Sequence, residues 1–156
     1  MKNIILFIPA LFFFWQCTAQ KTVVENDKPT YDPEMATEYG ADEYGMKQYV
    51  IAFLKKGPNR PTDQEEAARL QAAHMKNIKR LAAEGSLILA GPFLDNGDLR
   101  GIYIFDVKTI EEAKALTESD PAIQAGSLMM ELHPWYGSAA LMSVPDDHIR
   151  VQKTSF

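Results

Sequence analysis

The chain has 156 residues, of which 46% are hydrophobic and 24% are charged, and its formal net charge is −5. This length and composition are typical of one globular domain and argue against a multidomain chain. Because the chain is acidic and has no run of basic residues, it lacks the features that bind a phosphate backbone, and nucleic acid is excluded as an expected partner.

The N-terminus has the organisation of a signal peptide. Lys2 precedes an almost continuously apolar stretch over residues 4–15, which is long enough for the centre of a signal but too short to span a bilayer. Cys17-Thr18-Ala19 matches a signal-peptidase site, so residues 1–19 are the predicted signal peptide. We therefore expect an exported protein, periplasmic or extracellular, without membrane attachment after cleavage.

The alternative at this end of the chain is a lipoprotein anchored at Cys17. Lipidation favours a small residue just before the cysteine, whereas Trp15 and Gln16 are bulky. Cleavage after residue 19 would leave 15 basic and 21 acidic side chains, a formal charge of −6. It would also leave no cysteine, which excludes disulfides, thiolate catalysis and cysteine-ligated zinc.

The mature chain is predicted to have three parts. Residues 20–46 show no steady apolar period and form an N-terminal arm or linker, of which residues 39–46 are expected to dock on the domain. The domain covers residues 47–142. A polar C-terminal tail follows over residues 143–156.

The domain begins with a strand and a long helix. Residues 49–54 are rich in β-branched and aromatic side chains, which predicts a strand. Thr62 and Glu65 have the spacing of a capping box, which predicts that a helix starts there. Gly85 suits the left-handed position that ends such a helix.

A hairpin and a second helix follow. Strands are predicted over residues 87–90 and 101–107, and the turn signal at residues 95–98 predicts that they pair as a hairpin. Thr109 and Glu112 form a second capping box at the start of a helix that runs to about residue 118.

Asp120-Pro121 stops that helix or restarts it as a short turn, because proline suits the first position of a helix. A fourth strand is predicted over residues 128–132, ending at Pro134. The order β-α-β-β-α-β is that of the ferredoxin-like fold, so the predicted fold class is α+β.

Both faces of the predicted sheet are apolar. In the third strand Ile102 and Ile104 point to one face, whereas Tyr103 and Phe105 point to the other. Two helices can cover only one face of a sheet. Since large exposed apolar patches are rare on monomers, the second face is expected to pack on a second copy in a homodimer.

His74 is the residue that points most directly to chemistry. It lies within an apolar stripe of the first long helix that includes Leu70, Ile78 and Leu81. An imidazole partly withdrawn from water can act as a general acid or base near neutral pH. The alternative is a buried histidine that is satisfied by one hydrogen bond.

Asp120 also has two interpretations. As a helix cap it accepts backbone N–H bonds, and the following proline favours that role. As a functional group it would hold the second ring nitrogen of His74, as the carboxylate does in catalytic triads. Spacing alone favours the cap.

Four other residues are weaker candidates for ligand binding. Arg60 can hold an anionic group through paired hydrogen bonds, or it is a solvated loop charge. Phe93, Trp135 and His133 are predicted to form the pocket wall. A position at a dimer interface explains His133 and Trp135 equally well. The three histidines lack metal-ligand spacing and no phosphate loop is present, so no metal and no cofactor is expected.

A pattern of small residues and turns around these candidates resembles the YCII-related proteins. It consists of His74, Gly85, Ala90-Gly91-Pro92, Gly101, Glu112-Ala113, Asp120-Pro121 and Ala125-Gly126. The resemblance covers about residues 49–135, and the flanking segments look like an exported bacterial branch. It implies a ferredoxin-like domain that dimerises through its sheets, the dimeric α+β barrel type. It also implies a pocket in which His74 and Asp120 are an acid–base pair.

These observations favour a cofactor-independent small-molecule enzyme. In this hypothesis His74 moves a proton and Asp120 orients it, which suits lyase, isomerase or hydrolytic elimination chemistry. One alternative is a periplasmic module that binds a small ligand in the same pocket without turnover. Another is a structural dimer in which the two residues only stabilise the fold.

Overall fold

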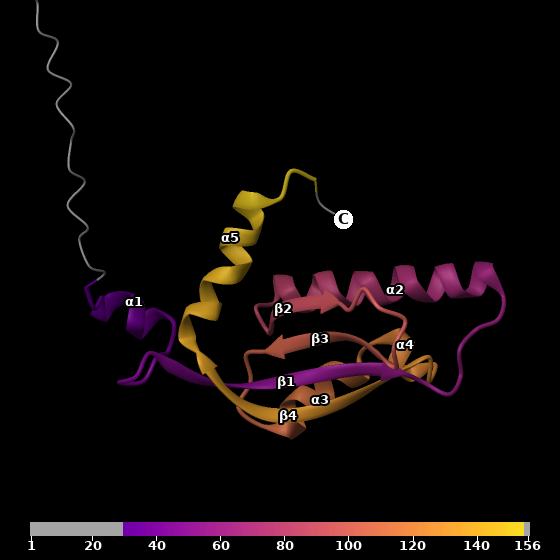
Figure 1. The fold of residues 1–156 in the computed structure, drawn as a ribbon, viewed down its shortest axis with the longest axis horizontal. Coiled ribbons are helices and arrows are strands. Elements are labelled where there is room, and N and C mark those ends of the chain that lie inside the picture. The colour runs from indigo at the N-terminus through magenta and orange to yellow at the C-terminus, as the bar shows by residue number, and fades with distance from the viewer. Residues whose placement is uncertain (1–29, 155–156) are drawn as a thin grey trace, which may run out of the picture. The chain divides into compact units, whose positions relative to one another are not determined.

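The computed structural model describes residues 30–154 (Figure 1). The chain divides into two units, residues 1–31 and 32–156, and all described helices and strands lie in the second. The predicted signal peptide, including Cys17, falls outside the described residues. In the described part, no helix is long and apolar enough to cross a membrane.

Four antiparallel strands form one sheet in the order β2-β3-β1-β4 (Figure 1). The strands are β1 (Met46–Lys56), β2 (Leu87–Pro92), β3 (Leu99–Phe105) and β4 (Leu128–Ser138). β2 and β3 pair as the predicted hairpin, and β1 lies between β3 and β4. This order is that of the ferredoxin-like α+β fold, which confirms the predicted fold class.

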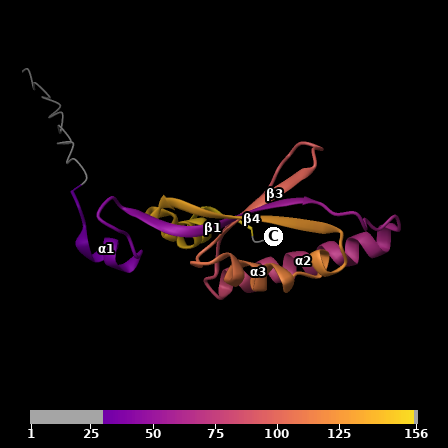
Figure 2. The ribbon, with the colours of Figure 1, turned by 90° about the horizontal axis from the view of Figure 1, so that it is seen from below.

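Two helices cover one side of the sheet (Figure 2). They are α2 (Gln64–Ala83) and α3 (Ile110–Glu118), and the single turn α4 (Pro121–Gln124) follows α3. The capping box of Thr109 and Glu112 at the start of α3 is confirmed. The short turn predicted after Asp120 is α4.

The capping box predicted at Thr62 and Glu65 is wrong. α2 is capped by Asp63, whose side chain accepts a hydrogen bond from the backbone N–H of Glu66 at 2.8 Å. Asp is at least as good a cap as Thr, and its negative charge is favourable at the positive end of the helix dipole. The helix ends as expected, with Gly85 at a φ of +76°.

The main core lies between the sheet and the two long helices. Val50, Ala52 and Leu54 alternate along β1 and point toward the helices. Tyr103 and Phe105 of β3 point to the same side and are almost fully buried. The buried apolar side chains on the helix-covered face therefore form one cluster across the central strands β1 and β3.

The opposite face of the sheet is partly covered by the chain that follows β4. Leu141 and Met142 of the 3-10 helix η1 (Ala139–Ser143) pack against a second buried cluster of Tyr49, Ile88 and Ile104. The predicted tail then contains a helix, α5 (Val144–Val151). Its first turn holds a proline and two acidic residues and its last turn holds basic ones, an arrangement that stabilises a helix.

The segment before β1 is also ordered. It contains α1 (Pro33–Glu38), which Asp32 caps. Residues 39–46 dock on the domain as expected, because the carbonyl of Gly45 accepts a hydrogen bond from the backbone N–H of Ala139 at 2.9 Å. β4 continues beyond Pro134 because it is an edge strand, where a missing N–H costs no ladder hydrogen bond.

Candidate active site

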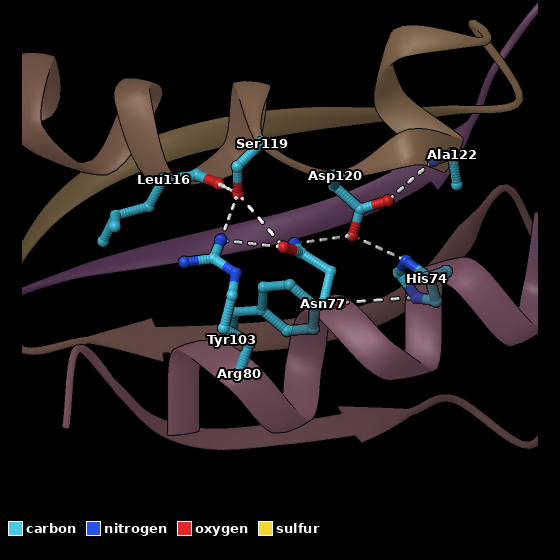
Figure 3. Close-up of polar contacts among 8 residues, drawn as sticks. All are labelled: His74, Asn77, Arg80, Tyr103, Leu116, Ser119, Asp120 and Ala122. Atoms are coloured by element: carbon cyan, nitrogen blue, oxygen red, sulfur yellow. Dashed lines mark hydrogen bonds and ion pairs between the residues drawn. The ribbon is translucent and has the colours of Figure 1, made fainter. Parts of the chain in front are cut away.

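His74 and Asp120 meet on the helix-covered side of the sheet (Figure 3). His74 lies near the middle of α2, and Asp120 is the cap residue of α4. Nδ1 of the imidazole is 2.7 Å from Oδ2 of the carboxylate. His74 is 7% exposed and Asp120 is 0% exposed, so this charge-assisted hydrogen bond is shielded from water.

Asp120 combines the two roles that the sequence left open. Its Oδ1 accepts the backbone N–H of Ala122 at 2.8 Å, which caps α4. Its Oδ2 accepts the hydrogen bond from His74 and a longer one, 3.4 Å, from Nδ2 of Asn77. Each carboxylate oxygen therefore has its own function, and the cap fixes the orientation of the acid.

The partner of each ring nitrogen assigns the tautomer of His74. Because a carboxylate is an acceptor, Nδ1 carries the proton and Nε2 of the neutral ring carries the lone pair. The hydroxyl of Tyr103 lies 3.3 Å from Nε2. Burial raises the pKa of Tyr103, and the charge of Asp120 raises it further, so the phenol stays protonated and donates to Nε2.

A polar network supports the pair from the solvent side. Nη2 of Arg80 donates to Oδ1 of Asn77 and to Oγ of Ser119, both at 2.9 Å (Figure 3). The other arm of the Arg80 guanidinium binds both carboxylate oxygens of Glu84 at 2.8 Å. The amide of Asn77 is thereby held with its N–H side toward Asp120.

A cavity of about 550 Å³ lies beside His74. Its size falls within the range of small-molecule sites. Both His74 and Tyr103 contribute to its wall, so the two residues that meet at Nε2 also border the space. The wall is otherwise mostly apolar and is formed by Leu54, Arg60, Pro61, Ala67, Leu70, Gln71, Met75, Ile78, Ala90, Gly91, Pro92, Arg100, Gly101, Ala122, Ser127 and Leu128.

Of the four residues predicted to bind a ligand, Arg60 lines this cavity and donates from Nη1 to the carbonyl of Ser127 at 3.3 Å. Phe93, His133 and Trp135 do not line it. Phe93 follows β2 and is 41% exposed.

His133 and Trp135 lie on the face of the sheet opposite to α2. Strand alternation places them there because Leu132 of the same strand packs against the helix-side core. The ring of Trp135 lies 5.9 Å from that of Tyr49, and Nε2 of His133 is 2.8 Å from Oε1 of Glu131. The third histidine, His148, lies in α5.

Two residues of the site were missed in the sequence. Tyr103 belongs to one apolar face of the third predicted strand, so the sequence pattern does not distinguish it from its apolar neighbours. Its place on the helix-facing side, together with His74 on the sheet-facing stripe of α2, was a usable signal for their contact. Arg100 precedes a glycine at the start of β3 and has no sequence pattern that singles it out.

Comparisons with known proteins give a family. The model of the YCII-related domain matches residues 50–135. Uncharacterized protein YjpA of Bacillus subtilis (strain 168) is 33% identical over 64 residues, which cover 41% of this chain and 73% of YjpA.

Among solved structures, the chain is similar to 5-chloro-2-hydroxyhydroquinone dehydrochlorinase (TftG) from Burkholderia phenoliruptrix AC1100, in complex with 2,5-dihydroxybenzoquinone. The identity is 23% and the TM-score 0.42, over 55% of this chain and 92% of that one. The family match spans more than half of the 156 residues and includes both His74 and Asp120. The chain therefore belongs to the YCII-related domain family.

Proposed function

We propose that this protein is a cofactor-independent small-molecule enzyme in which His74 transfers a proton and Asp120 orients the imidazole. The observation that carries the proposal is the 2.7 Å bond from Nδ1 to Asp120, made by a histidine that also lines a cavity. A carboxylate on Nδ1 keeps the lone pair on Nε2, which is then the atom that accepts a proton from a ligand.

The arrangement suits a reaction with separate proton removal and proton return. When Nε2 takes a proton, the negative charge of Asp120 stabilises the imidazolium, and the interaction is strong because the pair is buried. The imidazolium then returns the proton to a leaving group or to a neighbouring carbon. This course suits lyase, isomerase and hydrolytic elimination reactions that begin with the removal of a proton.

Tyr103 has a supporting part in this proposal. Its hydroxyl stays protonated and its bond to Nε2 is long at 3.3 Å, so a ligand can displace it at little cost. Once displaced, the hydroxyl is a neutral donor next to the reacting group. Such donors stabilise negative charge that develops on an oxygen atom.

The test is the turnover of His74→Gln against a panel of compounds that eliminate or isomerise when a proton is removed. Wild-type protein is screened first, by absorbance of the conjugated product. In His74→Gln, turnover should fall by about 10²–10⁴-fold while the melting temperature stays close to that of the wild type. His133→Gln is the matched control, because His133 is also paired with a carboxylate but lies outside the cavity.

The outcomes separate the alternatives. Full turnover in His74→Gln would show that the acid–base role is wrong. Ligand binding that needs His74, without turnover of any compound by the wild type, would identify a binding module. A lower melting temperature as the sole effect of the substitution would identify a structural pair.

We also propose that two copies pair through the sheet face opposite to α2. Ile51, Phe53 and Ile102 on that face remain partly exposed in the single chain, and burial of apolar surface drives association. Sedimentation should give a dimer for the wild type and a monomer for Phe53→Glu. Leu94→Glu, at a position 99% exposed in the β2–β3 loop, should stay dimeric. A monomeric wild type would contradict the proposal.

Export stays a prediction that the N-terminal sequence supports. The mature protein from a producing cell should begin at Gln20, which N-terminal sequencing or intact mass measures. A lipid-modified N-terminus at Cys17 would support the lipoprotein alternative, and an uncleaved Met1 would contradict export.

A further inference from the structure

The cavity beside His74 has two arginines and no acidic residue in its wall. Arg60 lies in the loop after β1, and Arg100 lies near the start of β3. They belong to the same end of the sheet, because Lys55 near the end of β1 pairs with Leu99. In a chain with a net charge of −5, this wall is a local region of positive charge.

Neither arginine is neutralised by an acidic side chain in the part of the chain that the structure describes. Within residues 30–154, no Asp or Glu forms an ion pair with Arg60 or Arg100. The two lysines at the end of β1 differ, since Lys55 pairs with Glu131 and Lys56 with Asp98. Unpaired charges therefore border the cavity, whereas the neighbouring cations have partners.

Backbone carbonyls hold the two guanidinium groups in place without cancelling their charge. Nη1 of Arg60 donates to Ser127 at 3.3 Å, and Nη1 of Arg100 donates to Gly97 at 3.3 Å. A further weak contact joins Nη1 of Arg100 to the carbonyl of Asp95 at 3.5 Å. All three contacts use Nη1, so Nε and Nη2 on the other edge of each planar group are suited to a paired hydrogen bond with an anion.

The rest of the wall suits an apolar ligand body. Leu54, Leu70, Ile78 and Leu128 come from β1, α2 and β4 and surround the space. Sites for small molecules combine such an apolar lining with a few placed polar groups. The wall thus offers apolar contact to one part of a ligand and two positive charges to another.

We propose that Arg60 and Arg100 bind the anionic group, a carboxylate or a phosphate, of a small organic ligand whose apolar body fills the cavity beside His74. That the bound ligand would then present its reacting atom to Nε2 of His74 rests on the proposed function. Anion binding itself requires no turnover, so the two can be tested separately.

The experiment is calorimetric titration with four probes that share a phenyl ring: phenylacetate, phenyl phosphate, phenylacetamide and phenethylamine. At least one anionic probe should bind about tenfold more tightly than the neutral amide, and the amine should bind most weakly. The anionic probe that binds more tightly shows whether the site prefers a carboxylate or a phosphate.

Arg60→Gln and Arg100→Gln should each weaken the binding of the preferred anionic probe by about tenfold. The affinity for phenylacetamide should stay unchanged. Glutamine keeps part of the aliphatic stem, Arg60 is exposed and Arg100 is only partly buried, so the melting temperature should stay close to that of the wild type. Arg69→Gln is the matched control, because Arg69 is exposed on α2 and does not line the cavity. It should bind the probes like the wild type.

The inference is overturned if neither anionic probe binds more tightly than the amide. It is also overturned if both cavity variants bind the anion like the wild type, or if Arg69→Gln weakens binding equally. His74-dependent turnover of neutral compounds without anion binding would overturn this inference alone. The opposite result is anion binding that needs both arginines together with turnover that does not depend on His74. It would support this inference and contradict the proposed function.

Discussion

Nδ1 of His74 and Oδ2 of Asp120 are 2.7 Å apart, although 46 positions separate the two residues in the chain. The contact forms because α4 lies against α2 and its cap residue faces the imidazole (Figure 3). The backbone N–H of Ala122 holds the other carboxylate oxygen. The geometry of the acid–base pair thus depends on a helix cap.

The dual role of Asp120 predicts different costs for two substitutions. Asp120→Ala removes the cap and leaves Nδ1 of His74 and Nδ2 of Asn77 buried without an acceptor. It should lower the free energy of unfolding by about 3 kcal/mol. Asp120→Asn keeps an oxygen for the Ala122 N–H and should cost about 1–2 kcal/mol. Urea unfolding at neutral pH measures both, and equal costs would contradict the cap.

Asn77 should matter more for stability than its charged neighbour Glu84. Asn77→Ala removes the buried amide that links Asp120 to Arg80 and should cost about 1–2 kcal/mol. Glu84→Ala removes an exposed pair one helical turn from Arg80 and should cost about 0.5 kcal/mol or less. Urea unfolding of the two variants compares them. A larger loss for Glu84→Ala would contradict the supporting role of the network.

Sequence patterns predicted the order and type of the core elements because apolar period, capping residues and turn signals are local. The cap of α2 was misplaced by one residue, since Thr62 and Asp63 are adjacent and either can cap. α5 was missed because its sequence is polar and it has no buried residue. Helix formation there depends on end effects and on contacts that a one-sequence pattern does not contain.

The site could be predicted only in part. His74 was found because a histidine interrupts an apolar stripe, and its partner Asp120 because the motif resembles the YCII-related proteins. Arg100 could not be found, since an arginine after a turn is common and its place in a cavity wall depends on the tertiary fold. Trp135 was placed in the pocket although strand alternation directs it to the other face.

Tyr103 should make the fold sensitive to alkaline pH. Burial and the charge of Asp120 raise its pKa above the ordinary value of 10.0, so the folded state holds the proton more tightly than the unfolded state. The stability that this provides is fully present below about pH 10 and falls as the pH rises further.

Tyr103→Phe should therefore lose less stability than the wild type between about pH 9 and about pH 11. Burial also raises the pKa of Tyr49, which leaves part of the loss in the variant. Urea unfolding across this range measures the difference. An identical alkaline loss in both proteins would contradict the assignment to Tyr103.

Two glycines of the cavity wall should differ in their tolerance of alanine. A Cβ at Gly101 would lie 2.5 Å from the carbonyl oxygen of Gly91 and 3.2 Å from Cα of Pro92, so β2 and β3 would have to separate. Gly101→Ala should cost about 2 kcal/mol. A Cβ at Gly91 meets nothing within 4 Å, and Gly91→Ala should change stability by less than about 0.5 kcal/mol. Thermal unfolding checks both, and an unaffected Gly101→Ala would contradict the close approach.

In the proposed function, Asp120 holds the proton on Nδ1 of His74, a residue of the cavity wall, and leaves Nε2 as the base. Long-range ¹H–¹⁵N correlation spectra of histidine-labelled protein report the tautomer directly, and His74→Gln assigns the signals. We predict that the neutral imidazole carries its proton on Nδ1 in the wild type and on Nε2 in Asp120→Asn. A wild-type imidazole with the proton on Nε2 would contradict the account.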